Sequence, residues 1–485
     1  MSSFPVELAK WLTKQAIQNA GGVVGTTNPA IALIKKALAY NYQRKNRLRD
    51  QPWNPAPAWA ASTAYVIGQE VVNGGNVYVC NGAGTSASSG GPTTATDAFI
   101  TDGTVSWEYL YSNQFTTSLP DGPSWSSSTT APSSPNNAKF YRNALSGYSS
   151  GATTVITADT WFTVLGFTGG LGSSGIGVSG VGRGGISFMM DAATLVIARN
   201  SSAGYGMFVE VDGQYLTESF IPDLATGHAS TYTTITFPSK KDRRIVLRFD
   251  TQQSVPLQGI YTDAFSNIWP AQTLSDTVAA AFMCDSYGLG GAQPRGSNEQ
   301  PFWDRTVPAT IAARLGFDNC YINSVSGTGF VAGSSVYGAP ARVTAVAAYN
   351  PNIVFTLCSV NDTGLNAAAI QAAVVAYIQA MRAALPNALF VFIGVTGGRT
   401  GPDAGEVAAI AGITQAADSN TIFLPGSTAV PEPVNNGSGY NGSFAGLGNA
   451  DWYMANNLHP TAKGALNVGK RMSLEFETAF AATSN

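Results

Sequence analysis

The C-terminal part of the chain alternates between short apolar runs and longer helix-like stretches, and this alternation restricts the possible folds more than any other feature. The apolar runs have the length of strands. They are Val278–Met283, Cys320–Asn323, Ile353–Cys358, Leu389–Val395 and Thr421–Leu424, and the stretches between them include Trp303–Leu315, Asn366–Leu385 and Gly405–Ala416. Strands that alternate with helices predict a parallel sheet covered by helices on both faces. We therefore expect an α/β/α domain over residues 276–485.

Residues 138–275 have a different pattern, in which apolar and polar side chains alternate along short segments. Examples are Phe208–Gly213 and residues 245–249. This alternation is typical of strands buried on one face, and several such strands predict a β-sandwich of the jelly-roll type. Residues 113–137, which are rich in Ser, Pro and Thr, are interpreted as a linker.

Residues 53–112 are predicted to form a small all-β module. Short runs of β-branched and aromatic residues are separated by turn sequences at Gly74-Gly75 and Asp102-Gly103. A module of this length is near the lower size limit for independent folding.

Residues 1–50 are predicted to form two short helices. Asn28 followed by Pro29 is typical of a helix N-cap and a first-turn proline, and apolar residues then recur at helical spacing. Two short amphipathic helices bury little apolar surface alone, so we expect them to dock on another domain, a partner or a second copy. The segment holds eight Lys and Arg against two Asp and Glu, and the basic cluster near its end is interpreted as a solvated helix end.

Composition excludes several classes of protein. Only 11% of the residues are charged and the formal net charge is −3, so the chain as a whole gives no reason to expect a nucleic-acid partner. No apolar stretch reaches the ~18–20 residues of a membrane span, and the first residues lack the basic and apolar regions of a signal peptide. The four cysteines have neither disulfide-framework nor CxxC spacing. We therefore expect no membrane span, no metal site and no cofactor.

Segments of polar residues and glycine follow the first three expected strands of the α/β/α domain. They are residues 284–288 after the first strand, 323–329 after the second and 359–362 after the third. In a parallel sheet the chemistry takes place at these carboxyl ends. A serine nucleophile needs a base with a pKa near neutrality, and His459 is the only histidine of this domain.

Four segments carry a resemblance to a known family. They are Cys284-Asp-Ser-Tyr-Gly288, Asn323-Ser-Val-Ser-Gly-Thr-Gly329, Ser359-Val-Asn-Asp362 and Asn456-Asn-Leu-His-Pro460. In this order and spacing they resemble the four blocks of the SGNH (GDSL-type) hydrolases. The resemblance implies Ser286 as nucleophile and His459 as general base. It also implies an oxyanion hole formed by the backbone N–H groups of Ser286 and Gly327 and the side-chain amide of Asn361, and it implies no metal or cofactor.

Two positions depart from the family pattern. Cys284 stands where the family has glycine, and Asn456 stands where it has the aspartate that orients the histidine. Asparagine stabilises an imidazolium less well than aspartate. Three alternatives remain: a Ser–His dyad whose imidazole is oriented by Asn456 or a backbone carbonyl, a triad completed by Asp451, or a weak enzyme. Carbohydrate esterases with a jelly roll before an SGNH domain include members without this aspartate, which favours the dyad.

The small β-module carries a second resemblance. The residues Ala58, Trp59, Tyr65, Gly68, Val71, Gly75, Tyr78 and Trp107 resemble the chitin-binding-type carbohydrate modules of bacterial glycosidases. The resemblance implies that Trp59, Tyr78 or Trp107 contacts sugar rings. The other interpretation is that these aromatic side chains form the core of the module.

Together these features predict a serine esterase that removes acyl groups, O-acetyl above all, from a polysaccharide. The helical start, the low charge and the sugar-module architecture suggest a phage tail-associated protein that acts outside the host cell. Residues 1–50 would then attach to the virion, and a homotrimer would suit a tail protein. One alternative is a weak or inactive tail protein that only binds a glycan, and another is a lipase or thioesterase of the same family.

Overall fold

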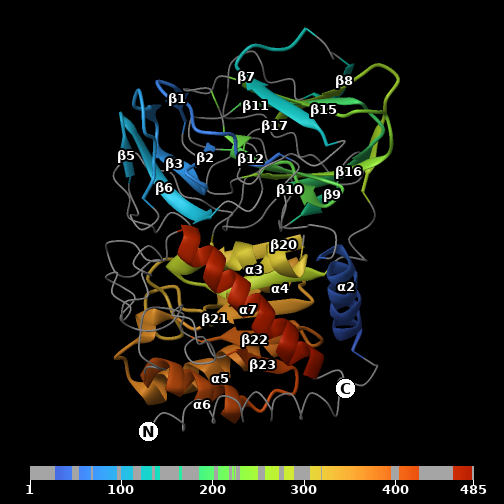
Figure 1. The fold of residues 1–485 in the computed structure, drawn as a ribbon. Helices are drawn as coiled ribbons and strands as arrows, with labels where there is room; N and C mark the ends of the chain where they lie inside the picture. The colour runs from blue at the N-terminus through green and yellow to red at the C-terminus, as the bar shows by residue number, and fades with distance from the viewer. Residues whose placement is uncertain are drawn as a thin grey trace.

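The computed structural model describes residues 28–45, 54–66, 69–94, 100–112, 122–133, 137–141, 163–165, 185–200, 206–217, 221–222, 224, 230–249, 257–271, 278–288, 306–317, 319–394, 404–424 and 462–482. These residues form one parallel sheet with its helices, together with several antiparallel sheets (Figure 1).

The C-terminal domain is built on a five-stranded sheet of order β20-β19-β21-β22-β23, in which every neighbouring pair is parallel. The strands are β19 (Ala279–Cys284), β20 (Asn319–Ser324), β21 (Ile353–Leu357), β22 (Leu389–Ile393) and β23 (Thr421–Leu424). All side chains of β21, β22 and β23 are buried, as in a sheet covered on both faces. The predicted parallel sheet is therefore confirmed.

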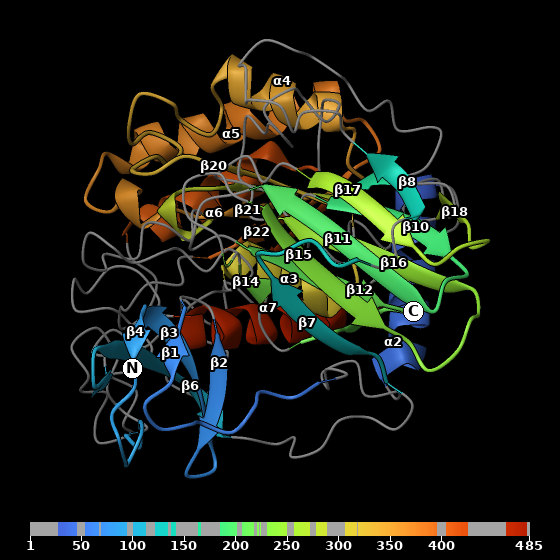
Figure 2. The same cartoon turned by 90° about the horizontal axis from the view of Figure 1, so that it is seen from above.

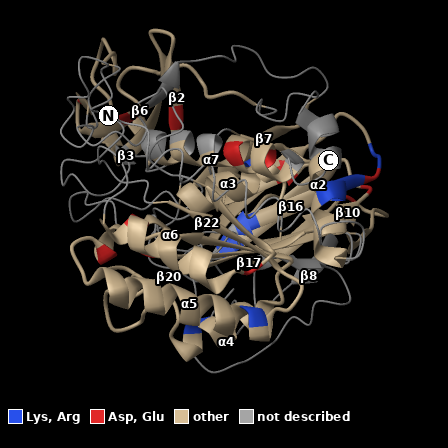
Figure 3. Cartoon of the chain, turned by 90° about the horizontal axis from the view of Figure 1, so that it is seen from below, with Lys and Arg blue, Asp and Glu red and all other residues tan. Residues whose placement is uncertain are grey.

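Helices cover both faces of this sheet. They are α3 (Val307–Leu315), α4 (Pro340–Tyr349), α5 (Ala367–Ala384), α6 (Ala404–Ala416) and α7 (Ala462–Ala482). Figure 2 shows α4 and α5 on one side of the strands and α3 and α7 on the other. Charged residues are few over these elements (Figure 3), in keeping with the low charged fraction of the sequence.

Helix α5 is long and apolar enough to cross a membrane by length and composition. In this structure it packs against α6, and Ile370, Val374 and Met381 on its buried face belong to the core of the parallel-sheet domain. Of the apolar window of this helix, 28% is buried inside the structure.

The middle of the chain forms two antiparallel sheets that face each other. One has the order β13-β12-β16-β10-β18, with β14 beside β12 and β9 beside β10, and the other has the order β7-β15-β11-β17-β8. Their shared core takes Phe188 from the first sheet and Ile197 from the second. The strands are β7 (Ser124–Ser128), β8 (Asn137–Tyr141), β9 (Thr163–Leu165), β10 (Gly185–Met190), β11 (Thr194–Asn200), β12 (Gly206–Val211), β13 (Gln214–Tyr215), β14 (Ile221–Pro222), β15 (Ser230–Thr236), β16 (Arg243–Phe249), β17 (Leu257–Thr262) and β18 (Ile268–Pro270).

The expectation of a linker over residues 113–137 needs correction. Residues 124–128 form β7, an edge strand that pairs with β15. The side chain of Trp125 packs against the core between the two sheets. Ser127 Oγ also lies 3.0 Å from Thr233 Oγ1 of β15, so a half-buried tryptophan and a hydroxyl contact hold a strand whose serine-rich composition is typical of a linker.

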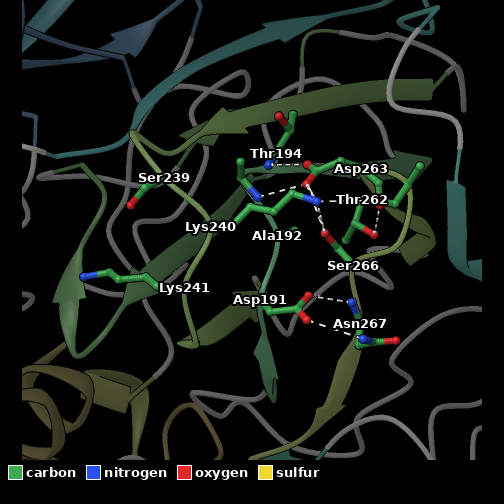
Figure 4. Close-up of polar contacts among 12 residues, drawn as sticks. Asp191, Ala192, Thr194, Ser239, Lys240, Lys241, Thr262, Asp263, Ser266 and Asn267 are labelled. Carbon is green, nitrogen blue, oxygen red and sulfur yellow. Dashed lines mark hydrogen bonds and ion pairs between the residues drawn. The ribbon is translucent and has the colours of Figure 1, made fainter.

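The turn between β17 and β18 is held by two carboxylates (Figure 4). Asp263 accepts hydrogen bonds from the backbone N–H groups of Ala193 (3.1 Å) and Thr194 (2.6 Å). Asp191 accepts one from the backbone N–H of Asn267 (2.6 Å). The turn is therefore fixed to the start of β11.

The small module contains a four-stranded antiparallel sheet of order β2-β3-β6-β5 and a two-stranded sheet, β1-β4. The strands are β1 (Ala64–Tyr65), β2 (Glu70–Asn73), β3 (Asn76–Gly82), β4 (Gly84–Thr85), β5 (Ile100–Asp102) and β6 (Val105–Ser112). Gly74, Gly75 and Gly103 turn the chain with positive φ, at the positions where the sequence predicts turns. Asn54 joins the module to the middle domain, since its backbone N–H donates to the carbonyl of Leu216 (3.0 Å).

Helix α2 (Pro29–Lys45) is the helix predicted after Asn28, whose side-chain oxygen accepts a hydrogen bond from the N–H of Ala30 (2.9 Å). Ile31 and Ile34 are buried in the same core as the parallel sheet. The docking site of α2 is thus the C-terminal domain. The helix expected before residue 28 lies outside the described residues.

Candidate active site

Three chain segments meet at the carboxyl end of the parallel sheet. Asp285 and the short 3-10 helix η2 (Ser286–Gly288) follow β19, the loop containing Gly327 follows β20, and the 3-10 helix η5 (Val360–Asp362) follows β21. Because β19 lies between β20 and β21, these three strand ends are neighbours. The three segments predicted to carry the chemistry are therefore brought together.

Ser286 is the first residue of η2 and is buried, with 5% of its surface exposed. The turn that carries it is closed by the N–H of Tyr287 donating to Asp285 Oδ1 (2.9 Å) and the N–H of Gly288 donating to Asp285 O (3.1 Å). A Cβ at position 288 would overlap the Cys284 sulfur, so glycine is needed there. Local hydrogen bonds and close packing thus fix the backbone around the candidate nucleophile.

Gly327 has a φ of +70°, a left-handed conformation that glycine adopts without strain. No atom lies within 4 Å of the position where a Cβ would stand, so the backbone here faces open space. The loop after Gly327 is fixed by Asp362, whose carboxylate accepts the backbone N–H groups of Phe330 (2.7 Å) and Val331 (3.0 Å). An exposed backbone on a rigid loop suits a close approach to a bound molecule.

Asn361 is half-buried, and its amide lies between the other two segments. Its Nδ2 lies 3.2 Å from Asp285 Oδ2, 3.1 Å from Thr328 O and 3.0 Å from Ser359 Oγ. The amide nitrogen is thus held next to the residue before Ser286 and the residue after Gly327. In this position these three acceptors of the amide nitrogen all belong to the protein.

Asp285 is almost completely buried, with 2% of its surface exposed. Its Oδ2 accepts a hydrogen bond from Ser359 Oγ (2.6 Å), in addition to the contact with Asn361. Burial raises the pKa of Asp285 to about 6, against the opposing effects of the hydrogen bonds from Ser359 and Tyr287 and of the Arg342 charge. The carboxyl group is therefore largely ionised above neutral pH.

Arg342 is a site residue that the sequence patterns did not mark. It lies on α4 and is 4% exposed. Its Nη2 donates to the carbonyl oxygens of Cys284 (2.9 Å) and Asn323 (2.8 Å) at the ends of β19 and β20. The one sequence signal for its helix is Pro340, at the first helical position. Nothing in the sequence shows that this arginine points into the sheet.

Cys284, one of the two positions that depart from the SGNH pattern, is fully buried. Its sulfur lies 3.9 Å from the carbonyl oxygen of Asn323, and burial raises the pKa of the thiol to about 12. The side chain therefore packs as a small apolar group and is not a nucleophile near neutral pH.

The predicted base and its possible orienting residues, His459, Asn456 and Asp451, lie outside the described residues. Their roles stay predictions. In the part of the chain that the structure describes, no group of three or more His, Cys, Asp or Glu side chains is arranged to hold a metal ion.

The aromatic residues of the small module take different places. Tyr78 and Trp107 are fully buried, so for these two the structure corrects the interpretation as sugar contacts and places them in the core. Trp59 is half-buried against Gly91, and its indole N–H donates to Asp102 Oδ2 (2.8 Å). Trp107 donates to the same oxygen (3.0 Å), a carboxylate bridge between the two indoles that sequence patterns did not reveal.

The sequence matches no protein-family model and no curated protein. Solved structures that resemble the fold include a carbohydrate esterase family 2 enzyme with a carbohydrate-binding domain from Corynascus thermopiles (Myceliophthora fergusii), at 18% identity and a TM-score of 0.44, covering 62% of this chain and 95% of that one.

Two further similar structures are a family two carbohydrate esterase from Clostridium thermocellum in complex with cellohexaose, and a GDSL-like lipase from Bacteroides ovatus. The first has 14% identity and a TM-score of 0.43 and covers 62% of this chain and 94% of that one. The second has 11% identity and a TM-score of 0.40 and covers 64% of this chain and 86% of that one. These neighbours are carbohydrate esterases and a GDSL-like lipase at low identity, so the activity of this chain has to be argued from its own residues.

Proposed function

We propose that this protein is a serine esterase that hydrolyses ester-linked acyl groups, O-acetyl above all, on a polysaccharide. The observation that supports the proposal most directly is the meeting of Ser286, the Gly327 loop and the Asn361 amide at one end of the parallel sheet. An esterase needs a nucleophile beside donors that face the developing oxyanion, and this arrangement can provide both.

In the proposed reaction Ser286 Oγ attacks the ester carbonyl carbon while His459 takes the hydroxyl proton. The negative charge of the tetrahedral intermediate falls on the carbonyl oxygen, which the N–H groups of Ser286 and Gly327 and the amide of Asn361 would stabilise. The C–O bond to the sugar then breaks, and the sugar oxygen takes the proton from His459. Water, which gives a proton to His459, then attacks the acyl carbon. The bond between that carbon and Ser286 Oγ breaks, the acid leaves, and Ser286 Oγ takes the proton back from His459.

The Asn361 amide carries two hydrogens, which allows it to serve two purposes. One hydrogen can stay on the internal acceptors around Asp285 Oδ2 while the other is directed at the substrate oxygen.

The proposal of a polysaccharide substrate draws on the sequence resemblance of the small module to chitin-binding-type modules. A place on a phage tail, virion attachment through residues 1–50 and a homotrimer are further proposals that draw on the same architecture.

The activity is tested by hydrolysis of 4-nitrophenyl acetate and by acetate release from acetylated xylan. We expect the wild type to be active and Ser286→Ala to lose activity about a thousandfold or more while keeping its fold. Ser473→Ala is the matched control, since it removes another buried hydroxyl, on α7, that bonds the carbonyl of Gly469 (2.7 Å). This control should keep full activity.

Two other outcomes favour the alternatives. A folded wild type without activity that still binds the glycan would support a binding protein, which Asn456 in place of aspartate already favours. A clear preference for medium or long 4-nitrophenyl acyl chains would support a lipase or thioesterase instead of a deacetylase.

A further inference from the structure

Two buried, oppositely charged side chains lie on either side of the strand end that carries Ser286. Asp285 is 2% exposed and precedes the nucleophile directly, whereas Arg342 is 4% exposed and reaches the same strand end from α4. The proposed chemistry assigns neither of them a step. Burying a charge is costly unless the charge is hydrogen-bonded and balanced, so their joint presence calls for a reason.

Arg342 uses all five of its N–H donors on neutral acceptors. Nε donates to Asn323 Oδ1 (2.7 Å), and Nη1 donates to Thr328 Oγ1 (3.0 Å) and Ser335 O (3.1 Å). Nη2 donates to the carbonyl oxygens of Cys284 and Asn323. One guanidinium therefore ties together the end of β19, the end of β20 and the loop after Gly327. These are the backbone segments on which Ser286 and the second proposed oxyanion donor stand.

Asp285 performs the matching task on the other side. One carboxylate oxygen accepts the N–H of Tyr287 in the turn of Ser286, and the other accepts from Ser359 Oγ and lies against the amide of Asn361. An ionised carboxylate only accepts hydrogen bonds, so Asp285 attracts the amide nitrogen of Asn361, which donates, and repels the amide oxygen. The nitrogen is therefore held at this place.

The charges also affect each other. A carboxylate one hydrogen bond away from the oxyanion hole opposes the negative charge that forms on the substrate oxygen, and this opposition is strong in a buried site. The Arg342 charge offsets it, and the same charge lowers the pKa of Asp285 against the effect of burial. Each charge thus lowers the free-energy cost of burying the other.

We propose that Asp285 and Arg342 are a charge-balanced pair of positioning residues, in which Asp285 holds the amide of Asn361 and Arg342 holds the chain ends that present Ser286 and Gly327. The inference rests on the proposed esterase function. Neither residue exchanges a proton or touches the substrate. Both act through the groups that do.

The test compares the kinetics of Asp285→Asn, Arg342→Met, Arg342→Lys and the double variant Asp285→Asn/Arg342→Met. Each of the first two should lower kcat about a hundredfold, with KM changed less than about threefold, because the groups they hold act in the transition state. Arg342→Lys should lie between wild type and Arg342→Met, since it keeps the charge but has fewer donors. The double variant should lose less than the product of the two single losses, which is the signature of a coupled pair.

The matched control is the ion pair of Arg382 with Asp418 in the same domain. Nε of Arg382 lies 2.7 Å from Asp418 Oδ2, and the pair lies beside the residues that precede β22 and β23, at the opposite end of the sheet. Arg382→Met and Asp418→Asn should lower the melting temperature and leave kcat unchanged. If they lower kcat as much as the Asp285 and Arg342 variants do, the effect is general destabilisation and the inference is overturned.

Labelling of Ser286 by a fluorophosphonate gives a second measurement that does not depend on turnover. Its phosphoryl oxygen occupies the oxyanion hole, so the labelling rate, followed by mass spectrometry, should fall in Asp285→Asn and Arg342→Lys, even if Arg342→Met fails to fold. Wild-type rates in both variants would overturn the inference and leave the esterase intact. A wild type that neither hydrolyses 4-nitrophenyl acetate nor labels at Ser286 would overturn the proposed function itself, and the inference with it.

Discussion

Cys284 and Gly288 share one small space next to the candidate nucleophile. The Cys284 side chain fills the volume beneath the turn, and Gly288 leaves room for it because it has no Cβ. A family pattern with glycine at the first position would leave this volume to another side chain. Cys284 therefore fills space beneath the turn. The turn around Ser286 depends on the combined side-chain volume at positions 284 and 288.

This packing predicts a compensating pair of substitutions. Gly288→Ala should destabilise the fold by about 1–3 kcal/mol, as overpacking does, and lower kcat, because the added methyl overlaps the Cys284 sulfur and Ser324 Oγ. Cys284→Ala should keep kcat within a few-fold, and adding it to Gly288→Ala should restore part of the loss. Urea unfolding and 4-nitrophenyl acetate kinetics measure both effects. A double variant as impaired as Gly288→Ala would show that the space is not shared.

At this scale the sequence predicted that the segments containing Ser286, Gly327 and Asn361 meet, because each follows an apolar run and parallel strands end at one edge. The choice of these three residues within the segments came from the resemblance to the SGNH blocks. It could not predict the role of Arg342. The hydrogen bond from Arg342 to Cys284 O joins residues 58 positions apart, and no local pattern separates an inward-pointing arginine from a solvated one. Sequence patterns report periodicity, whereas these contacts depend on how α4 packs on the sheet.

Among the elements, the turn between β17 and β18 shows how a strained segment is held. Phe265 has a φ of +61°, which is unusual for a bulky residue, and is 97% exposed, so its own packing gives no compensation. The carboxylate of Asp263 stabilises the turn instead, through Lys240 Nζ (3.0 Å), Ser266 Oγ (3.0 Å) and two backbone N–H groups (Figure 4).

The turn predicts a stability that depends on pH. Burial alone would raise the pKa of Asp263, but its hydrogen bonds from Ala193, Lys240, Ser266 and Thr194 lower it to about 2. Its contribution, about 2 kcal/mol, is therefore complete above the unfolded-state pKa near 4 and is lost as the pH falls towards 2. Asp263→Asn should be less stable than wild type at pH 7, and the difference should shrink between pH 5 and pH 3.

Urea unfolding at a series of pH values measures this difference, with Asp242→Asn, on the exposed neighbouring turn, as the control. A difference between wild type and Asp263→Asn that does not change with pH would mean that the variant acts by steric disturbance and not through the lost charge.

At the scale of elements, the sequence predicted the strands and helices that have a strong apolar periodicity, and it missed the edge strand β7. The five parallel strands and α3, α5 and α6 follow from repeated apolar positions. Strand β7 does not, because its sequence is serine-rich and the contacts that hold it, of Trp125 with the core and of Ser127 with Thr233, form only in the folded sheet. The fate of Tyr78 and Trp107 was open for the same reason, since an aromatic residue in a strand can face either side and only the folded sheet decides.

Across the whole molecule, the first described helix and the last two hundred or so residues share one core. Ile31 and Ile34 of α2 are buried among the side chains of the parallel-sheet domain, and the side-chain amide of Asn28 donates to the carbonyl of Asn387 (3.1 Å). The small module contacts α7 of the same domain through β6 (Figure 1).

This shared core predicts that a change in α2 destabilises the parallel-sheet domain, although most of that domain lies far from α2 in the sequence. Ile34→Ala should lower the free energy of unfolding by about 2–4 kcal/mol, the usual cost of removing a fully buried large aliphatic side chain. Lys36→Ala, on the exposed side of the same helix, should change it little. Thermal unfolding monitored by loss of esterase activity measures the effect. Equal melting temperatures for Ile34→Ala and wild type would mean that α2 is not part of this core.

The docking of α2 also determines how the polypeptide can be divided. The C-terminal domain is discontinuous in sequence, with the small module and the two facing sheets inserted between its first helix and its first strand. A fragment that begins near residue 276 would lack part of its own apolar core and would present the surface that Ile31 and Ile34 cover to water. An excised parallel-sheet domain should therefore need α2 supplied in trans or fused across the gap. Proteolytic removal of the intervening domains, in contrast, should leave α2 bound.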